Sequence, residues 1–304
     1  MSDHPIPTKD EIQQVLTEGR NWGRWGDDDG VGAINLITPA KRLQATALVQ
    51  TGRTVSMSRL FPKNPGPLNP VPAQHFIKSF DRGSGGAVID FYGVAYHGFA
   101  TTHIDALCHV WDEHGAWNGR DPKSFITTDG VTFADITNWQ SGIITRGVLI
   151  DVPAHRNTPH VTIDQPVHGW ELEEIAAAQG VELGPGDALI VYSGREHYQA
   201  ENPTAYMGDT PSPGLHASCA KFIRDHDVSL LGWDMMDAKP NDYDMPWPVH
   251  SVLFSFGVAL MDNALLQPLA EACREENRWE FLFMLLPLPV AGGTGSPANP
   301  IAMF

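Results

Sequence analysis

Asp187-Ala-Leu-Ile-Val-Tyr192 decides the fold class, because a short, uninterrupted apolar run predicts a strand that is buried on both faces. Upstream of it, Gly169–Gln179 has the spacing of a helix, and Arg146-Gly-Val-Leu-Ile-Asp-Val152 predicts a second buried strand. Downstream, the helical pattern of His216–Asp225 precedes a third strand, Val228–Gly232. This alternation favours an α/β fold in which a mixed sheet is flanked by helices.

The alternation continues on both sides of this region. Further strands are predicted at Ala87–Tyr96, Val252–Met261 and Glu280–Leu286, and further helices at Thr8–Arg20, Pro39–Thr51 and Asn263–Cys273. The proline-rich residues 62–86 predict a long covering loop without regular structure. A length of 304 residues allows two domains, but no linker interrupts the pattern. We therefore expect one domain over residues 1–304, with a helical and loop extension over about residues 1–60.

The charge balance restricts the classes of partner. The chain has 20 Lys and Arg against 36 Asp and Glu, which gives a net charge of −16. A negative field of this size repels nucleic-acid phosphates and anionic membrane surfaces. We therefore expect a small-molecule substrate, and neither nucleic acid nor a membrane as a partner.

The N-terminal residues and the cysteines bear on the compartment. Residues 1–20 are polar, unlike a signal peptide, and no apolar run approaches the roughly 20 residues that cross a bilayer. Cys108, Cys219 and Cys273 show no paired spacing, so the sequence predicts neither a disulfide framework nor a cysteine zinc site. We expect a cytoplasmic location.

One segment gathers side chains that can do chemistry: Tyr96-His-Gly-Phe-Ala-Thr-Thr-His-Ile-Asp-Ala-Leu-Cys-His-Val110. On a strand, His103 and Asp105 point to the same side, about 6 to 7 Å apart. If the chain turns helical after Asp105, His109 returns to the same region. The flanking residues are apolar, and a buried carboxylate is costly unless it is paired or binds a cation. The segment therefore predicts a metal or catalytic site.

Further ligands must come from elsewhere, because a divalent metal needs more donors than one short segment supplies. His250 and Asp262 are the best distant candidates, since they flank the strand predicted at Val252–Met261. Asp262 also has an ordinary alternative role, because it could cap the helix predicted to begin near Asn263. The residues alone leave this choice open.

The stretch Phe99-Ala-Thr-Thr-His-Ile-Asp-Ala-Leu-Cys-His109 resembles the signature H-x-G-T-H-x-D-x-P-x-H of the cyclase family of metal-dependent hydrolases. That family includes bacterial kynurenine formamidase and isatin hydrolase. The resemblance covers most of the chain, including Trp25-Gly26, Gly32–Pro39, Arg146–Val152, Gly184–Asp187 and Gly292–Pro297. It implies the swivelling β/β/α fold and a homo-oligomer, either a dimer or a tetramer.

The resemblance also implies roles for individual residues. His103 and Asp105 would bind metal, and His109 would transfer protons. In the same family a later His and an acidic residue twelve positions beyond it complete the site, and His250 and Asp262 have that spacing. Asp262 stands where formamidases have Glu, so a carboxylate with a shorter reach would have to serve.

The signature is not matched throughout. Its first His falls on Phe99, and His97 is the candidate that would replace this ligand. The implied cofactor is a divalent metal, Zn or Mn. Two ions are implied if His97 serves as a ligand, and one ion if it does not.

Such a site predicts a hydrolase that cleaves an amide, imide, formamide or lactone bond of a small carbonyl compound with metal-activated water. His109 would take the proton from the water and deliver it to the leaving nitrogen or oxygen. Candidate walls of the substrate pocket are aromatic, although core packing is the more ordinary role for each: Trp22, Trp25, Phe99 and Trp111.

Two other functions fit parts of the pattern. His103-x-Asp105 with a distant His250 also suits a 2-His-1-carboxylate Fe(II) oxygenase, but no basic residue follows His250 until Arg274 to hold a 2-oxoglutarate carboxylate. A non-catalytic ligand-binding relative would explain the missing signature His. Gly292–Gly295 predicts a turn, because it lacks the Lys-Ser/Thr of a phosphate loop.

Overall fold

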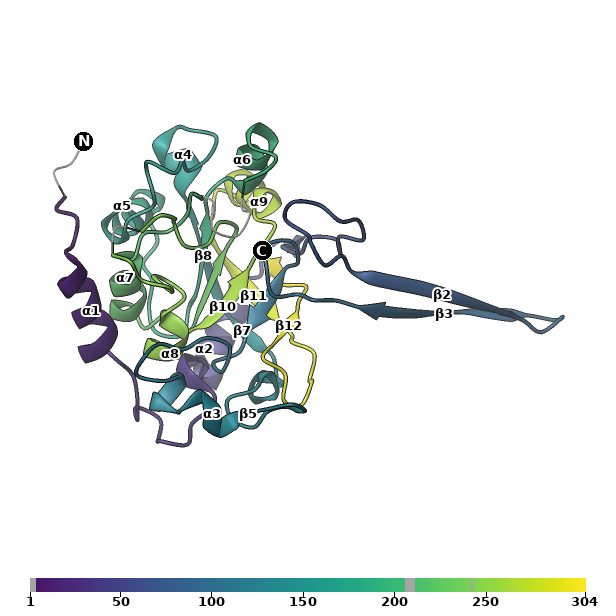
Figure 1. Ribbon diagram of the computed structural model, residues 1–304. Helices are drawn as coiled ribbons and strands as arrows, with labels where there is room; N and C mark the ends of the chain where they lie inside the picture. Colours follow the sequence, from purple (N-terminus) through teal and green to yellow (C-terminus); the bar gives the residue numbers. More distant parts are fainter. Residues whose placement is uncertain (1–3, 206–210, 242) are drawn as a thin grey trace.

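A large curled mixed sheet organises the structure, a computed structural model that describes residues 4–205, 211–241 and 243–304 (Figure 1). The first three residues of the predicted N-terminal extension lie outside this range. The sheet has nine strands in the order β1-β13-β11-β7-β8-β9-β10-β4-β12. Their bounds are β1 Thr54–Ser56, β4 His103–Asp105, β7 Ile143–Asp151, β8 Ala188–Tyr192, β9 Leu230–Trp233, β10 Ala259–Asp262, β11 Glu280–Leu285, β12 Gly295–Pro297 and β13 Ile301–Met303.

The centre of the sheet is parallel and its two sides are antiparallel. β7, β8, β9 and β10 run parallel to one another, whereas β4, β11, β12 and β13 pair antiparallel. Every residue of β8 and β9 is buried, as expected for parallel strands that are covered on both faces. The predicted α/β class with a mixed sheet is confirmed. This sheet is not the double-stranded β-helix of the 2-oxoglutarate oxygenases.

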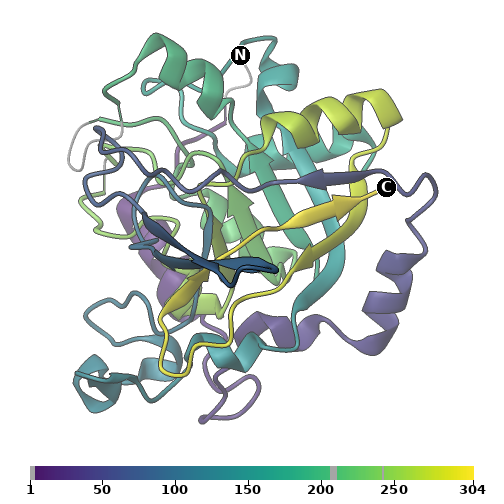
Figure 2. The same cartoon turned by 90° about the vertical axis from the view of Figure 1, so that its right-hand side faces the viewer.

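Helices flank the sheet and close its ends. α2 packs on β7 and β11, α5 packs on β7 and α7, and α9 packs on β1 and β7. Figure 2 shows α9 beside β1 and the C-terminal strand β13. The helices span α1 Lys9–Glu18, α2 Pro39–Thr46, α3 Pro122–Phe125, α4 Val152–Arg156, α5 Gly169–Gln179, α6 Arg195–Glu201, α7 Cys219–Asp225, α8 Val252–Phe256 and α9 Gln267–Glu276, with short 3₁₀ turns at Gly32–Leu36, Trp117–Gly119 and Ile136–Trp139.

The N-terminal helix forms where local chemistry predicts it. The Glu11 amide donates a 3.3 Å hydrogen bond to the Thr8 hydroxyl, and the Thr8 amide donates a 2.7 Å bond to the Glu11 carboxylate. This reciprocal cap satisfies amides that the first turn leaves unpaired. Ile12 and Leu16 then bury one side of the helix against the core.

The strand predicted at Val252–Met261 is wrong in its first half. Val252–Phe256 forms the short helix α8, which ends at Gly257 with a φ of 70°, and only then does β10 begin. A buried apolar run of this length does not distinguish a helix from a strand, so the glycine determines where the helix ends. Asp262 ends β10, and because α9 begins at Gln267 it does not cap that helix.

The loop predicted over residues 62–86 is also wrong in part. β2 (Gln74–Asp81) pairs antiparallel with β3 (Gly86–Gly93) as a hairpin that projects from the body (Figure 1). The last proline of the run is Pro72, so nothing prevents extended pairing beyond it. A second small sheet joins β5 (Ile126–Thr127) to β6 (Gly130–Val131).

No helix among the described residues is long and apolar enough to span a membrane. Cys108, Cys219 and Cys273 are buried free thiols. Burial raises the pKa of the Cys108 thiol to about 12.

Two glycines join the N-terminal extension to the body. Gly32 has a φ of 64° and Gly257 a φ of 70°, and the Ala33 amide donates a 2.8 Å hydrogen bond to the Gly257 carbonyl. A Cβ on Gly32 would lie 2.7 Å from Cδ1 of Leu107 and would overlap the Gly257 carbonyl. The backbone contact therefore needs glycine for both its conformation and its space.

We expect Gly32→Ala to lower the free energy of unfolding by about 3 kcal/mol, because left-handed strain and overpacking add. The matched control is Gly180→Ala, since Gly180 has a φ of 69° but no atom lies within 4 Å of the place where its Cβ would stand. The control should lose about 1 kcal/mol from strain alone. Urea denaturation measures both losses, and equal losses would contradict the close contact.

Candidate metal centre

The register of three strands brings distant residues onto one face of the sheet. β4 lies between β10 and β12, and His103 pairs directly with Asp262 of β10. His103 and Asp105 are two residues apart, so their side chains share a face. Residues directly opposite in an antiparallel pair also share a face, which adds Asp262. The shared face predicted for His103 and Asp105 from their spacing therefore holds in the structure.

Asp105 lies at the centre of the cluster and is 1% exposed. Its Oδ1 lies 2.9 Å from Nδ1 of His97 and 3.3 Å from Nε2 of His103, and its Oδ2 lies 3.8 Å from Nε2 of His109. Neither oxygen has a hydrogen-bond partner with acceptable geometry among the described residues. Burial acts to raise the pKa of Asp105, but His109 and His103 outweigh it and hold that pKa well below its usual range.

His103 is held in the orientation of a ligand. Its Nδ1 lies 2.8 Å from the Thr101 carbonyl, so this nitrogen carries the proton and Nε2 faces the carboxylates. Nε2 lies 3.3 Å from Asp105 and 4.0 Å from Asp262. Burial acts to lower the pKa of His103, but Asp105 and Asp262 raise it to about 9. A cation between the three groups would replace that proton.

His97 reaches the same carboxylate from the loop before β4. Its Nε2 lies 3.0 Å from the Thr294 hydroxyl, while its Nδ1 is buried, faces Asp105 and has no hydrogen-bond partner among the described atoms. Gly295 lies beside it, and a Cβ there would stand 3.2 Å from Cε1 of His97. Thr294 therefore orients the imidazole and Gly295 leaves room for it.

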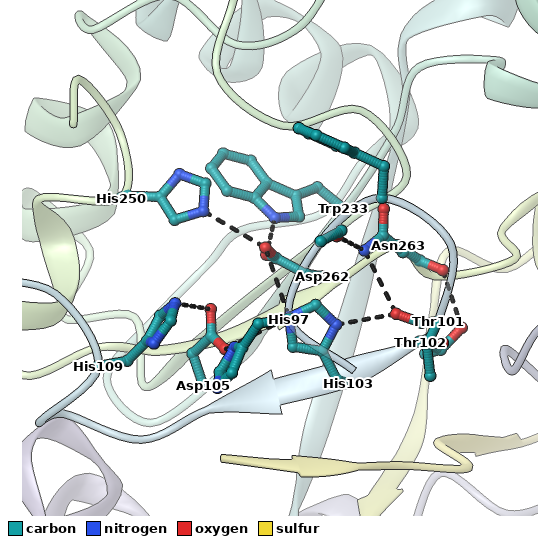
Figure 3. A network of polar contacts seen from close by, with 12 residues as sticks. His97, Thr101, Thr102, His103, Asp105, His109, Trp233, His250, Asp262 and Asn263 are labelled. Atoms are coloured by element: carbon teal, nitrogen blue, oxygen red, sulfur yellow. Dashed lines mark hydrogen bonds and ion pairs between the residues drawn. The ribbon is translucent and has the colours of Figure 1, made fainter. Parts of the chain in front are cut away.

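His250 and Asp262 complete the cluster from the other side (Figure 3). His250 Nε2 lies 3.3 Å from Asp262 Oδ2, and the indole Nε1 of Trp233 donates to Asp262 Oδ1. The Nδ1 of His250 donates to Asp237, whose other oxygen accepts a 2.5 Å bond from the Val249 amide. Burial acts to lower the pKa of His250, but Asp237 and Asp262 raise it well above its usual value.

His109 stands at the open side of the cluster. Its ring stacks on that of His97, with centroids 3.8 Å apart and planes 4° from parallel. Its side chain is 25% exposed. Burial lowers the pKa of His109 to about 4, with a smaller opposing effect from Asp105. The imidazole is therefore neutral near pH 7 and can accept a proton. The chain reaches it through a turn after Asp105 and not through the helix that the sequence allowed.

The cluster offers two overlapping sets of donors that share Asp105. His97, Asp105 and His109 form one set, and His103, Asp105 and Asp262 form the other, with the ligand atoms of each set within 4.8 Å of one another. Imidazole nitrogens and carboxylate oxygens suit Zn and Mn. The unpartnered oxygens of Asp105 are the feature a cation would satisfy, so these residues fit a divalent metal.

A pocket of about 290 Å³ opens beside the cluster. Phe99 lines it, but Trp22, Trp25 and Trp111 do not. Trp22 donates a 2.6 Å hydrogen bond to the Phe254 carbonyl, Trp25 packs 6.2 Å from the Trp117 ring, and Trp111 lies 42% exposed on the surface. The structure thus places one of the four predicted wall residues at the pocket.

Sequence reasoning missed several residues that shape the site. Asp237 and Trp233 orient His250 and Asp262, yet each has the pattern of an ordinary residue at or after the end of a strand. Thr294 lies in the glycine-rich stretch predicted as a turn. The remaining pocket wall includes Met236, Lys239 and Trp247. The one sequence signal for Asp237 is its short distance from the predicted strand Val228–Gly232, after whose carboxyl end it lies.

Several known proteins are similar to this chain in sequence or in structure. A crystal structure of a novel cyclase has a TM-score of 0.84 at 28% identity, covering 95% of this chain and 99% of its own. Isatin hydrolase A from Labrenzia aggregata has a TM-score of 0.60 at 16% identity, over 87% of this chain and 98% of its own, and so shows a shared fold. Kynurenine formamidase of Bacillus cereus is 28% identical over 89 residues, which is 29% of this chain and 39% of that enzyme's length.

The family model described as "Putative cyclase" matches residues 47–240, more than half of the chain. The matched region contains the signature stretch with His103, Asp105 and His109. On this match the chain belongs to the cyclase family.

Proposed function

We propose that this protein is a metal-dependent hydrolase that cleaves an amide, imide, formamide or lactone bond of a small carbonyl compound with water. The observation that carries the proposal is the buried carboxylate of Asp105, with two unpartnered oxygens that face three imidazoles. A buried carboxylate is costly unless positive charge faces it, and the imidazole nitrogens around it are metal ligands, so the arrangement favours a bound cation. The formamidase relative supports the hydrolytic class.

Five side chains would hold the metal: His97, His103, Asp105, His250 and Asp262. When bound there, a divalent metal lowers the pKa of water from near 16 towards about 7 and polarises a carbonyl oxygen. The chain's own contribution is to fix the donors. The Thr101 carbonyl, the Thr294 hydroxyl and Asp237 each engage the far nitrogen of one imidazole.

His109 would be the proton carrier. It is neutral because burial lowers its pKa to about 4, and it lies at the junction between the cluster and the pocket. It can take a proton from the attacking water and return it to the leaving nitrogen or oxygen. Stacking on His97 fixes the plane of the ring for both transfers.

The pocket wall suits a small compound with an apolar body. Phe99, Met236 and Trp247 supply apolar surface, and the volume of about 290 Å³ lies at the lower limit for small-molecule sites. These side chains hold the substrate beside His109 and exclude bulk water.

The test is to remove metal with a chelator, restore Zn, Mn or Fe(II) singly, and assay cyclic imides, lactones and N-formyl aromatics. We expect hydrolysis to disappear on chelation and to return with Zn or Mn. An oxygen electrode runs alongside. Oxygen uptake that depends on Fe(II) would contradict the hydrolase and favour the oxygenase, and tight binding without turnover would favour a non-catalytic binder.

Asp105→Asn should weaken Zn or Mn binding by at least about 100-fold, because it removes the charge that both donor sets share. Equilibrium dialysis with elemental analysis measures the change. Asp112→Asn is the matched control, since Asp112 pairs with Arg20 at 2.9 Å outside the cluster and should leave metal binding unaltered. Equal metal content in both variants would overturn the proposed metal site.

His109→Asn should lower kcat by about 10²- to 10⁴-fold while metal content stays within about twofold of the wild type. The effects on kcat and on metal content must be measured separately, because His109 also lies close enough to Asp105 to be a ligand. Stopped assays give kcat and elemental analysis gives metal content. Loss of metal in this variant would reassign His109 from proton transfer to metal binding.

A further inference from the structure

The pocket wall carries two groups of polar side chains. His97, His109 and His250 belong to the donor cluster, whereas Ser212 and Lys239 do not. Lys239 is the one Lys or Arg among the described residues that line this pocket. Neither the matched signature nor the proposed hydrolytic step gives this lysine a role.

We propose that Lys239 makes the enzyme selective for substrates that carry a carboxylate, which the lysine ammonium binds while the scissile carbonyl lies at the metal cluster. This inference rests on the proposed function and narrows its substrate to a carboxylate-bearing amide, imide, formamide or lactone. The apolar side chains of Phe99, Met236 and Trp247 line the same pocket and would contact the body of the substrate.

The backbone at Lys239 is fixed. The Ser212 amide donates a 2.9 Å hydrogen bond to the Lys239 carbonyl, and the Lys239 amide donates a 2.9 Å bond to the Ser212 carbonyl. This isolated antiparallel bridge joins two segments at the pocket wall. Ser212 is 6% exposed and lines the same pocket, so a hydroxyl group lies beside the lysine. An ammonium and a hydroxyl together suit the oxygens of a carboxylate.

Among the residues that the structure describes, none neutralises the charge of Lys239. Lys239 makes no ion pair and no side-chain hydrogen bond with any part of the chain that the structure describes. Asp237, two residues away, is occupied by the His250 imidazole and the Val249 amide. The ammonium therefore remains available to a ligand.

The net charge of the chain bears on the role of Lys239 in the pocket. A chain with a net charge of −16 repels small anions at long range. The Lys239 ammonium opposes that field at the pocket wall, outside the donor cluster. A neutral substrate would gain nothing from an ammonium there, and a cationic one would be repelled.

The experiment compares two substrates that differ in the carboxylate alone, N-formylanthranilate and N-formylaniline. It measures kcat/KM for the metal-loaded wild type, Lys239→Met, Lys239→Arg and the control Lys123→Met, whose lysine is exposed on α3. We expect the acid-to-neutral ratio of kcat/KM to fall about 10- to 100-fold in Lys239→Met, mainly through KM. Arg should retain most of the ratio, and Lys123→Met should retain all of it.

A binding measurement separates failure of this inference from failure of the proposed hydrolase. Calorimetry with benzoate and benzamide on the metal-free protein needs no turnover, and we expect Lys239→Met to weaken benzoate binding alone by at least about tenfold. If no substrate is hydrolysed but benzoate binding depends on Lys239, the hydrolase fails and the carboxylate site stands. An unchanged ratio, or benzoate binding that ignores Lys239, overturns the carboxylate site even when hydrolysis is observed.

Discussion

The rest of the site depends on the burial of one carboxylate, that of Asp105. Asp105 is carried by a short strand between two partners that are distant in sequence, and its side chain is buried on one face of the sheet. A carboxylate in that position costs several kcal/mol unless positive charge faces it. Asp105 and Asp262 raise the pKa of His103 to about 9, so an imidazolium faces the carboxylate, and a metal ion would supply the positive charge in its place.

Behind the donors lies a second set of polar contacts that fixes the backbone. Asn263 follows β10 with a φ of 55°, and its side chain donates a 2.6 Å hydrogen bond to the Gly98 carbonyl. Arg195 donates to the Asn263 side chain at 2.6 Å and to the carbonyl of Phe99. Asp234 in turn accepts the amides of Ser193, Gly194 and Arg195 at the start of α6. The loop that carries His97 is thereby tied to the end of the sheet.

Sequence alone predicts the parts of this arrangement that depend on local periodicity. Parallel strands covered on both faces have continuous apolar runs, so β7, β8 and β9 are recognisable, as is the shared face of His103 and Asp105. The helical first half of Val252–Met261 is not recognisable, because the end of the helix depends on one glycine in the left-handed region. The first strand of the hairpin, Gln74–Asp81, is masked by the prolines that precede it, whereas the second overlaps the strand predicted at Ala87–Tyr96.

The contributions of Asp237 and Thr294 could not be predicted, for a different reason. Each acts by orienting an imidazole supplied by another segment, and the contact exists only after the chain has folded. Neither the type of a residue nor its spacing in the sequence indicates such a contact between two segments. Trp22 and Trp25 are a similar case, because their residue type suits a pocket wall but the folded chain packs them elsewhere, whereas Phe99 lines the pocket.

The pairing of β4 with β10 and β12 has a consequence for the chain during its synthesis. The strand with His103 and Asp105 leaves the ribosome long before Asp262 and Thr294 are made. A nascent chain that stops short of β10 holds an unpaired edge and an incomplete donor set. Completion of the donor cluster is therefore tied to the late stages of translation, and a truncated product that ends before Asp262 lacks one of its two carboxylates.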